Sequence, residues 1–542
     1  MKKLDISGEI ATATIPELLQ KQAEKCGDRP YAHFPDKTLT YAQLHAQATD
    51  WAAAFHAAGI RPGDHVATLM PNCWEWVPVY YGALYAGAIL VALNSRYKRH
   101  ELAYTLAHSR SKILVTTEAF AEHVDYRELL ADVLPDLSGQ TAMQLNVKAA
   151  PDMNSIVMFG KSTGGAIANH EEFLALGTSV QPEALQSARD TRNVDDTAAI
   201  IYTSGTTSNP KGCELTHGGL QNCWSTFSRV IGLDETQSMW LPMPFFHTGG
   251  IGPMTTILEH GASFITQPHF DAEEIVEMIE RYEVNHLYSG FPQLTLPVLE
   301  SPRFDRERFT FVKSCLNVGP EATQRRIDSL LPDGALLLNL FGMTEGSGIV
   351  TFTPADAPLS LRIKSSGLPP PHTDVRIADP ETLEPCEDGT VGEIQFRGAG
   401  AFKKYYRNHE ATAETIIEGG WVRTGDRGKV GEDGTLYFLG RIKDMLKVGG
   451  ENVGALEIES FLQEFPEIRL AQVIGVPDER MGEVPVAFVE LMDDDAVLDE
   501  SQLIARCEGQ LAKWKIPRRA IFVKEWPMSA TKVQKFRLRD LL

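Results

Sequence analysis

Short apolar runs alternate with amphipathic stretches through the larger, N-terminal part of the chain. Runs with the length and composition of buried strands lie at 65–70, 88–93, 112–116, 198–202, 239–242, 260–267, 286–289, 311–317 and 335–340. Stretches with the apolar spacing of helices lie at 74–86, 98–109, 218–230, 271–282, 292–300 and 322–331. Because strands that alternate with helices at this spacing form βαβ units, the pattern predicts an α/β fold with parallel sheets.

Two stretches stand apart from this alternation. Positions 16–60 are expected to be helical, with Thr40 capping a helix that places Leu44, Trp51 and Phe55 on one face. Positions 117–190 have a weaker pattern, and no role is assigned to them.

The most apolar run of the chain lies at 76–93. Pro78, Gly82 and Gly87 interrupt it. Because these residues break helices, the run predicts a buried helix followed by a buried strand rather than a membrane span.

The pattern changes after about residue 354. Proline and glycine become more frequent, and short alternating strands are expected at 374–378, 392–397, 421–423 and 436–439. This pattern predicts a small β-rich subdomain over about 354–441, at the end of a large N-terminal domain, 1–441. The remaining residues, 442–542, are expected to form a small α+β domain.

Length, charge and cysteine usage narrow the class of protein. A chain of 542 residues is too long for one hydrophobic core. Its formal net charge of −21 argues against non-specific binding of nucleic acid or of anionic membranes. The seven cysteines are scattered without a Cys-x-x-Cys pair, and the N-terminus does not resemble a signal peptide. Together these features predict a cytoplasmic protein without a transmembrane segment.

The strand at 198–202 leads into a turn that is rich in hydroxyl groups. Five of the six residues from Thr203 to Ser208 carry a hydroxyl, and the sixth is Gly205. Such a turn offers O–H and N–H donors to an anion, and Lys211 adds a positive charge, so a polyphosphate ligand is expected. A solvated Ser/Thr turn is the alternative. Because Lys211 precedes Gly212, the order differs from that of a Walker P-loop.

A second polar segment follows the strand at 335–340. Glycine at the end of a parallel strand lets a ligand approach the backbone, and Phe341 offers a flat face for a base. Thr344 is a hydroxyl donor, and Glu345 is a hard oxygen ligand that suits Mg²⁺. The alternative is a helix N-terminus with an acid in its first turn.

Two further candidates have weaker local support. Asp426, in the sequence Thr-Gly-Asp, suits the two hydroxyls of a ribose, although an ordinary turn aspartate has the same pattern. His247 follows two aromatic residues and precedes two glycines, as expected of a flexible segment beside a pocket. A histidine satisfied in the core is the alternative there.

Five separated motifs resemble the adenylate-forming superfamily of acyl-CoA synthetases, adenylation domains and luciferases. They are Tyr-Thr-Ser-Gly-Thr-Thr-x-x-Pro-Lys-Gly at 202–212, Pro-Phe-Phe-His-x-x-Gly at 244–250, Phe-Gly-x-Thr-Glu at 341–345, Gly-Arg-Ile-Lys-Asp at 440–444 and the segment 526–536. The resemblance extends from about residue 16 to 540 and is greatest to an AMP-forming acyl-CoA synthetase. It implies an N-terminal domain of two α/β subdomains and a small β-barrel, then a mobile C-terminal domain beyond a hinge at Lys443.

The resemblance also implies a two-step reaction. A carboxylic acid and ATP give an acyl-adenylate and pyrophosphate, and coenzyme A (CoA) then gives acyl-CoA and AMP after the C-terminal domain has rotated. The catalytic residues implied are Lys532, Thr344, Glu345 and Lys211, with Glu345 as the Mg²⁺ ligand. The implied contacts of ATP and AMP are Thr203, Ser204, Gly205, Thr206, Thr207, Gly319, Pro320, Glu321, Phe341, Gly342, Met343, Asp426 and Arg441. Those of the acid are His247, Gly249 and Gly342, and those of CoA are Lys447, Gly449 and Gly450.

The segment around the expected catalytic lysine departs from the family pattern. The family has glycine directly before this lysine, where this chain has Thr531, and the loop is one residue shorter. Lys535 therefore competes for the role, although the position of Lys532 before Val-Gln-Lys-Phe favours Lys532. The alternative functions are the loading of a carrier-protein thiol and a degenerate nucleotide-binding homologue. The acid is left open, and a monomer or a homodimer is expected.

Overall fold

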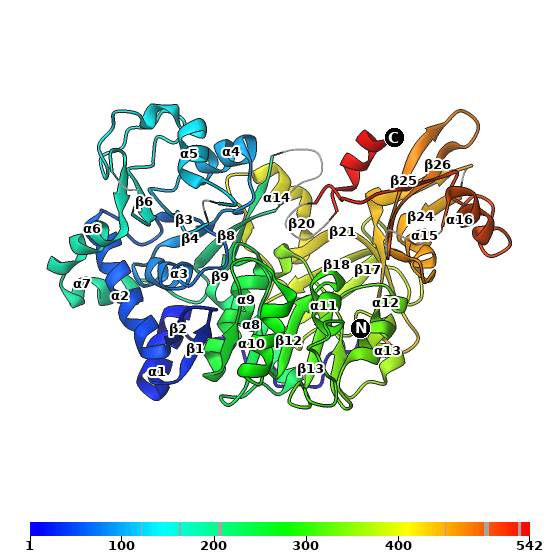
Figure 1. Cartoon of the computed structure of the whole chain (residues 1–542), viewed down its shortest axis with the longest axis horizontal. Helices are drawn as coiled ribbons and strands as arrows, with labels where there is room; N and C mark the ends of the chain where they lie inside the picture. The colour runs from blue at the N-terminus through cyan, green and yellow to red at the C-terminus, as the bar shows by residue number, and fades with distance from the viewer. Residues whose placement is uncertain (121, 162–163, 204–208, 450, 493–497, 529–532) are drawn as a thin grey trace.

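The structure is a computed structural model (Figure 1) that describes residues 1–120, 122–161, 164–203, 209–449, 451–492, 498–528 and 533–542. Its N-terminal part contains two largely parallel sheets, as the alternating pattern predicts. In the first sheet β8, β4, β3, β5, β6 and β7 are parallel, whereas β9 and β19 add an antiparallel edge. Its strands, in order across the sheet, are β19 (Lys404–Tyr405), β9 (Lys211–Thr216), β8 (Thr197–Thr203), β4 (Ile89–Ala92), β3 (His65–Leu69), β5 (Ile113–Thr117), β6 (Ser155–Phe159) and β7 (Ile167–Asn169).

The second sheet is formed mainly by the segment drawn in green in Figure 1 and also includes the N-terminal hairpin of β1 and β2. Apart from β2, which is antiparallel to β1, its strand pairs are parallel. In order across the sheet the strands are β14 (Leu336–Leu338), β13 (Ser314–Asn317), β12 (His286–Gly290), β10 (Ser238–Trp240), β11 (Ser263–Ile265), β1 (Pro30–His33) and β2 (Thr38–Thr40).

Helices separate the two sheets and cover their outer faces. The N-terminal helices are α1 (Ile15–Cys26), α2 (Tyr41–Ala57), α3 (Trp76–Tyr85), α4 (Arg99–Ser109), α5 (Tyr126–Val133), α6 (His170–Ala175), α7 (Pro182–Asp190), α8 (His217–Ile231), α9 (Thr248–His260), α10 (Ala272–Arg281), α11 (Pro292–Leu299), α12 (Glu321–Leu330) and α13 (Leu359–Lys364). One core joins α2, α3, α8 and α9 to the facing sides of both sheets. Separate cores lie beneath α4 and α5 on the first sheet and beneath α10, α11 and α12 on the second.

Strand β8 shows how the sequence produces these layers. Ala199 and Ile201 belong to the core between the sheets, whereas Ile200 and Tyr202 pack in the core beneath α4 and α5. Successive side chains of a strand point to opposite faces, so an entirely apolar run is buried on both sides. The same burial explains the apolar run at 76–93, which forms α3 and β4 as predicted. No helix within the described ranges is long and apolar enough to span a membrane.

One expectation about the first part of the chain needs correction. Residues 16–60 are not helical throughout, because β1 and β2 separate α1 from α2. Ala32 pairs with Phe264, so a distant partner fixes this strand, and local periodicity does not reveal it. The weakly patterned stretch 117–190 contributes β6 and β7, which extend the first sheet beyond β5.

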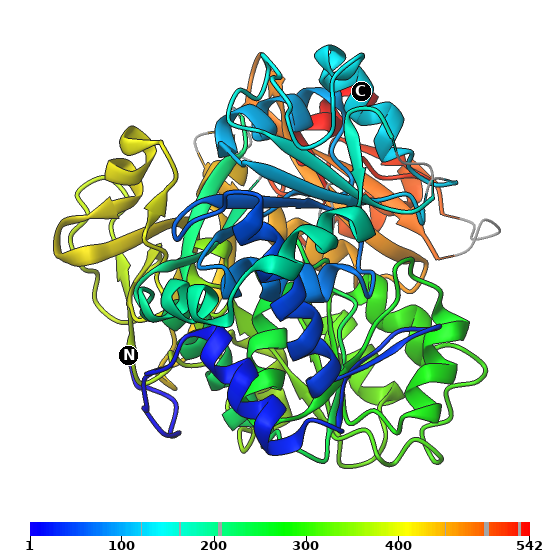
Figure 2. The same ribbon diagram turned by 90° about the vertical axis from the view of Figure 1, so that its left-hand side faces the viewer.

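A third, antiparallel sheet occupies the β-rich part of the chain, drawn in yellow in Figure 2 beside the two layered sheets. Its strands are β17 (Thr373–Ala378), β18 (Gly392–Gly398), β20 (Ile416–Ile417), β21 (Trp421–Val430) and β22 (Leu436–Arg441). Near it are the short strands β15 (Leu340–Phe341) and β16 (Thr351–Phe352) and the helix α14 (His409–Thr415). The N-terminus is held here, since the Leu4 N–H donates to the Pro369 carbonyl (2.9 Å).

A fourth sheet, with its own core, follows the 3₁₀ turn η5 (Ile442–Asp444) after β22. Its elements are β23 (Met445–Val448), β24 (Glu451–Gly454), α15 (Ala455–Leu462), β25 (Ile468–Asp478), β26 (Gly482–Leu491), α16 (Glu500–Cys507), β27 (Arg519–Phe522) and the 3₁₀ turn η6 (Lys535–Leu541). This unit is drawn in orange and red in Figure 1. The linker residues Ile442–Asp444 include Lys443, the expected hinge.

Candidate active site

The β8–β9 hairpin positions Lys211 at the edge of the first sheet. Thr203, the last residue of β8, pairs with Lys211, the first residue of β9. The Lys211 ammonium lies over the ring of Tyr405, 5.0 Å from its centroid. The turn itself lies outside the described residues, and with it four predicted ATP contacts: Ser204, Gly205, Thr206 and Thr207.

Glu345 is a buried carboxylate held by the edge strand β19. It lies in the short 3₁₀ turn Thr344–Gly346, and the residue is 8% exposed. The Tyr405 hydroxyl donates to Glu345 Oε1 (2.5 Å), and the Phe402 N–H donates to the Glu345 carbonyl (2.8 Å). Burial and the Glu345 carboxylate raise the pKa of the Tyr405 phenol far above its usual value, so the phenol is a neutral donor.

Sequence reasoning did not identify Tyr405. Its contact with Glu345 depends on β19, which pairs with β9 so that Tyr405 lies opposite Cys213. Burial and the same Glu345 carboxylate raise the pKa of Cys213. Because β9 also carries Lys211, this edge of the sheet brings together a cation and a carboxylate that are far apart in the sequence.

Removing the Tyr405 hydroxyl removes its hydrogen bond to Glu345 and should leave that carboxylate less firmly oriented. The family resemblance assigns Glu345 to Mg²⁺, and under that assignment the apparent affinity for Mg²⁺ in Tyr405→Phe should fall by about 10–100-fold, the usual cost of losing a group that orients a metal ligand. The measurement is pyrophosphate release against Mg²⁺ concentration. Tyr406→Phe removes the neighbouring hydroxyl and should leave the Mg²⁺ curve unchanged. Equal curves for both variants would contradict an orienting role for Tyr405.

Asp426 and Arg441 form an ion pair between neighbouring strands. They lie opposite each other on β21 and β22, and Arg441 Nε is 2.9 Å from Asp426 Oδ1. The Asp426 side chain is 4% exposed, whereas that of Arg441 is 39% exposed. The Asp426 N–H donates to Thr424 Oγ1 (3.0 Å), and both residues lie within β21. The Thr-Gly-Asp sequence is therefore part of a strand and carries a buried, paired carboxylate.

The charges of Asp426 and Arg441 both influence the pKa of Lys443. Burial lowers the pKa of its ammonium, and the positive charges of Arg441 and Lys211 act in the same direction. Asp444 and Asp426 oppose this shift. The charges of Lys211, Arg441 and Asp426 therefore all influence Lys443, which lies in the linker between the third and fourth sheets.

The segment before Glu345 holds a buried aromatic ring and a narrow turn. Phe341 stacks on Phe438, with the centroids 5.7 Å apart and the rings 27° from parallel. A Cβ atom on Gly342 would overlap the carbonyl oxygen of Gly348, so no larger residue fits there. Met343 comes next and lies directly before the turn that carries Glu345.

The predicted contacts at 319–321 lie between β13 and α12. A Cβ on Gly319 would lie 3.1 Å from the Pro292 ring. Pro320 caps α12, and Glu321 begins it. The Glu321 carboxylate pairs with Arg325 (2.6 Å) and Lys364 (3.6 Å), which holds this side chain on the helix surface.

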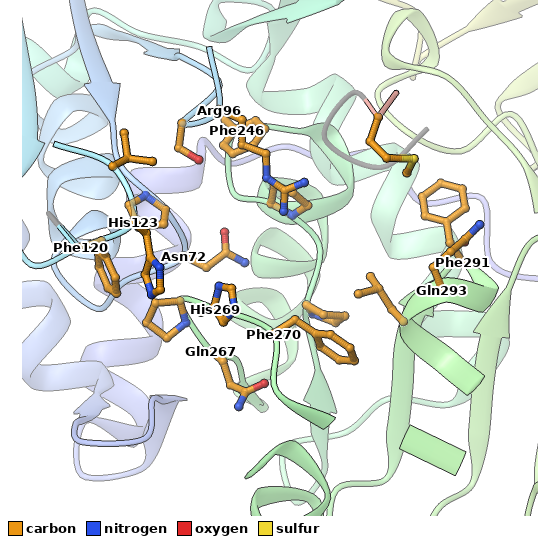
Figure 3. A pocket seen from close by; sticks show the side chains of 18 of the residues that line it. Asn72, Arg96, Phe120, His123, Phe246, Gln267, His269, Phe270, Phe291 and Gln293 are labelled. Atoms are coloured by element: carbon orange, nitrogen blue, oxygen red, sulfur yellow. The ribbon is translucent and has the colours of Figure 1, made fainter. Parts of the chain in front are cut away.

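His247 caps α9, and Gly249 lies in the first turn of that helix. A cavity of about 370 Å³ lies nearby, beside Phe246 (Figure 3). Its lining includes Asn72, Arg96, His123, Gln267, His269 and Phe291, and the rings of His123 and His269 stack with their centroids 5.0 Å apart. The described lining of the cavity does not include the three residues expected to contact the acid, His247, Gly249 and Gly342.

Sequence reasoning also missed Asn72. Its side-chain amide donates to the Met243 carbonyl (3.0 Å) and accepts from the Phe245 N–H (2.8 Å). Asn72 therefore ties the segment before His247 to the first sheet. A polar residue directly after β3 is the available signal, and it is too common to be diagnostic.

The predicted CoA contacts lie in the fourth sheet. Lys447 lies on β23, where its N–H donates to Glu483 Oε2 (2.8 Å). Gly449 adopts a left-handed conformation (φ 61°), and its N–H donates to the Met481 carbonyl (2.7 Å). Gly450 lies outside the described residues.

Lys535, the competitor for the catalytic role, is engaged in the C-terminal unit. Its ammonium lies 2.5 Å from Glu459 Oε1 and 3.8 Å from Asp444 Oδ2. The same Glu459 oxygen accepts the Val473 N–H (2.8 Å), and burial raises the pKa of Glu459. These contacts give Lys535 a structural partner and favour Lys532, which lies outside the described residues.

Comparison with known proteins identifies the family. The model for the AMP-binding enzyme family matches residues 19–406, and that for the AMP-binding enzyme C-terminal domain matches residues 457–532. The mitochondrial medium-chain acyl-CoA ligase ACSF2 of Rattus norvegicus is 30% identical over 546 residues, covering 97% of this chain and 88% of the relative.

Solved structures agree with this assignment. ATP-bound MatB from Rhodopseudomonas palustris is 29% identical, with a TM-score of 0.82 over 97% of this chain and 98% of that one. The anthranilate CoA ligase AuaEII in complex with anthranoyl-AMP is 25% identical, with a TM-score of 0.83 over 100% and 99% of the two chains. Both confirm the predicted α/β fold with a large N-terminal and a small C-terminal domain. The chain belongs to the AMP-binding enzyme family and is an AMP-forming acid–CoA ligase.

Proposed function

We propose that adenylation takes place where Lys211, Glu345 and the Asp426–Arg441 pair converge on the linker at Lys443. The observation that carries this proposal is the buried Glu345 carboxylate, held by Tyr405 while Lys211 lies over the same tyrosine ring. A fixed anionic oxygen beside a mobile cation suits a polyphosphate with its counterion.

The chemistry explains why these charges are needed. A carboxylate oxygen attacks the α-phosphorus of ATP, the bond to the β-phosphate oxygen breaks, and pyrophosphate leaves. An anion must therefore approach a polyanion, so catalysis depends on positive charge and on positioning. Lys211 and the hydroxyl-rich turn would bind the pyrophosphate end, and Lys532 would stabilise charge near the α-phosphate.

The residues around Glu345 fit a magnesium ion held largely by the nucleotide. Within the described ranges no group of three or more His, Cys, Asp or Glu side chains could hold a metal. Mg²⁺ commonly binds proteins through one or two carboxylates and takes its other ligands from phosphates and water. Glu345 would hold it beside Thr344, and the bound ion would neutralise phosphate charge.

The nucleoside would lie between the 319–321 segment and the third sheet. Asp426, which is buried and paired with Arg441, would accept hydrogen bonds from the ribose hydroxyls. Phe341 would stack on the adenine. Gly319, Pro320, Gly342 and Met343 would supply backbone contacts.

The second step would use CoA after the fourth sheet has turned about Lys443. The CoA sulfur attacks the acyl carbon, the bond to the AMP phosphate breaks, and the thiol proton is lost to solvent. The cavity beside Phe246 is a candidate channel for the thiol arm, with Arg96 as a cation in its wall. Lys447 and Gly449 would approach it by a hinge-type rotation that remakes one site for two reactions.

A pyrophosphate-release screen tests the proposed function. Wild-type protein with ATP and Mg²⁺ should release pyrophosphate with acids of a limited size range, and added CoA should then give a thioester and AMP. Acids graded in length, branching and aromaticity cover the chemical range. Release of pyrophosphate without thioester formation would favour a carrier-protein acceptor, and release with none of the acids would contradict the proposal.

Lys211→Ala is expected to slow the first half-reaction by about 10²-fold, because a cation at the phosphates is lost. The order of preference among acids should not change, since Lys211 is assigned to the pyrophosphate end. Lys404→Ala, on the neighbouring strand, removes a cation paired with Glu214 (3.7 Å) and serves as the control. A changed acid preference in Lys211→Ala would contradict this placement.

We also propose that the enzyme works in the cytoplasm as a monomer or a homodimer. Its scattered cysteines suit a reducing compartment. Light scattering on the purified protein would measure the assembly.

A further inference from the structure

Trp224 of α8 fills the space behind the turn that carries Glu345. Its side chain is buried, and the indole N–H donates to the Ser347 carbonyl (2.8 Å). A Cβ on Gly252 of α9 would overlap the indole, and one on Gly348 would lie 2.6 Å from its six-membered ring. The indole therefore occupies the volume that two glycines leave free.

Tyr288 of β12 continues this aromatic wall. The rings of Trp224 and Tyr288 meet edge to face, with centroids 5.5 Å apart and planes at 79°. Phe227, one turn along α8, contacts Tyr288 in the same manner at 5.5 Å. A Cβ on Gly249 would lie 3.3 Å from the Tyr288 hydroxyl, so the wall reaches the helix that His247 caps.

The aromatic wall lies where the carbon chain of the bound acid is expected. The acid's carboxylate must reach the α-phosphate near Thr344 and Glu345, so its carbon chain has to extend away from that turn. Ser347 and Gly348, which contact Trp224, directly follow the turn, and Gly249, an expected acid contact, lies beside the Tyr288 hydroxyl. The described lining of the cavity beside Phe246 includes neither Trp224 nor Tyr288.

We propose that Trp224 and Tyr288 close the acyl end of the site and restrict the enzyme to compact carboxylic acids. Short or branched aliphatic acids would fit, whereas medium and long linear chains would meet the indole. This inference rests on the proposed adenylation site at Thr344 and Glu345. Moving a close-packed wall of buried aromatic rings costs free energy, because overpacking a well-filled interior forces side chains away from their preferred rotamers.

The test compares kcat/KM for pyrophosphate release with linear acids from acetate to dodecanoate. Wild type should prefer the short acids. Each methylene forced against the wall should lower kcat/KM by about ten-fold or more. Trp224→Leu should raise the ratio of octanoate to butyrate activity by at least about ten-fold. Trp224→Phe, which keeps a ring and so preserves more packing, should shift the ratio in the same direction by less.

Trp51→Leu is the matched control. Trp51 is another buried tryptophan, and a Cβ on Gly82 of α3 would overlap its Cβ atom. This variant should lose stability without changing the ratio between acids. A wild-type preference for dodecanoate, or acid profiles of Trp224→Leu and Trp224→Phe equal to that of wild type, would overturn the inference. A wild type that releases no pyrophosphate with any acid would instead contradict the proposed function.

Discussion

Lys532→Ala is expected to abolish acyl-adenylate formation while leaving thioester formation from pre-made acyl-adenylate largely intact. In the wild-type enzyme the Lys532 ammonium would stabilise negative charge near the α-phosphate. Removing one such group lowers the rate by at least about 10²–10³-fold. The second half-reaction needs no charge at that position once pyrophosphate has left. ATP–pyrophosphate exchange measures the first step, and CoA added to synthetic acyl-adenylate measures the second.

Lys535→Ala is the informative comparison. It leaves the buried Glu459 carboxylate without its ammonium partner, and breaking such a pair costs about 3–5 kcal/mol of stability. Both half-reactions should then fall together with the fraction of folded protein, and Tm should drop. Lys532→Ala could instead lower the rates of both half-reactions equally at an unchanged Tm. That result would contradict the proposal that the C-terminal domain contributes different residues to the two steps.

The second large effect is expected at Glu345. Glu345→Gln keeps the shape of the side chain and an oxygen for the Tyr405 hydroxyl, but it removes the negative charge. The rate of adenylation should fall by about 10²–10³-fold at saturating Mg²⁺, as for the loss of one preorganised electrostatic group. Stopped-flow pyrophosphate release at increasing Mg²⁺ measures both the rate and the metal requirement, and thermal unfolding checks that the fold is unchanged.

Glu214→Gln provides a matched control for that experiment. Glu214 is also a buried carboxylate, on β9, where it accepts a hydrogen bond from Thr197 Oγ1 (3.1 Å). Its neutralisation should affect stability more than the Mg²⁺ requirement. An unchanged rate and an unchanged Mg²⁺ curve in Glu345→Gln would remove Glu345 from the metal site.

Much of the fold and several site residues could be predicted because their signals are local. The continuous apolar run of β8 predicts a strand that is buried on both faces, whatever its neighbours are. The alternation of strands with helices predicts the parallel sheets. The sequence does not predict the pairing of Asp426 with Arg441, although the family resemblance implies that both contact the nucleotide. It depends on the register of β21 and β22, which the motifs do not encode.

The residues that sequence reasoning missed depend on contacts between distant segments. Tyr405 reaches Glu345 because a short strand, 60 positions later in the chain, joins the edge of the first sheet. Trp224, which we propose to close the acyl end of the site, lies on a helix that is buried along most of its length, so the apolar spacing of the helix does not single it out. Neither residue belongs to a motif that was recognised.

The pairing of β1 with β11 has a consequence for the order of synthesis. Ala32 leaves the ribosome 232 positions before its partner Phe264 (264 minus 32). At about 5–20 residues per second, the N-terminal hairpin waits roughly 10–50 s for the strand that completes its sheet. During that interval its edge is open to other chains. The nascent protein therefore has a vulnerable period that the finished enzyme does not, and slow translation of the first half would prolong it.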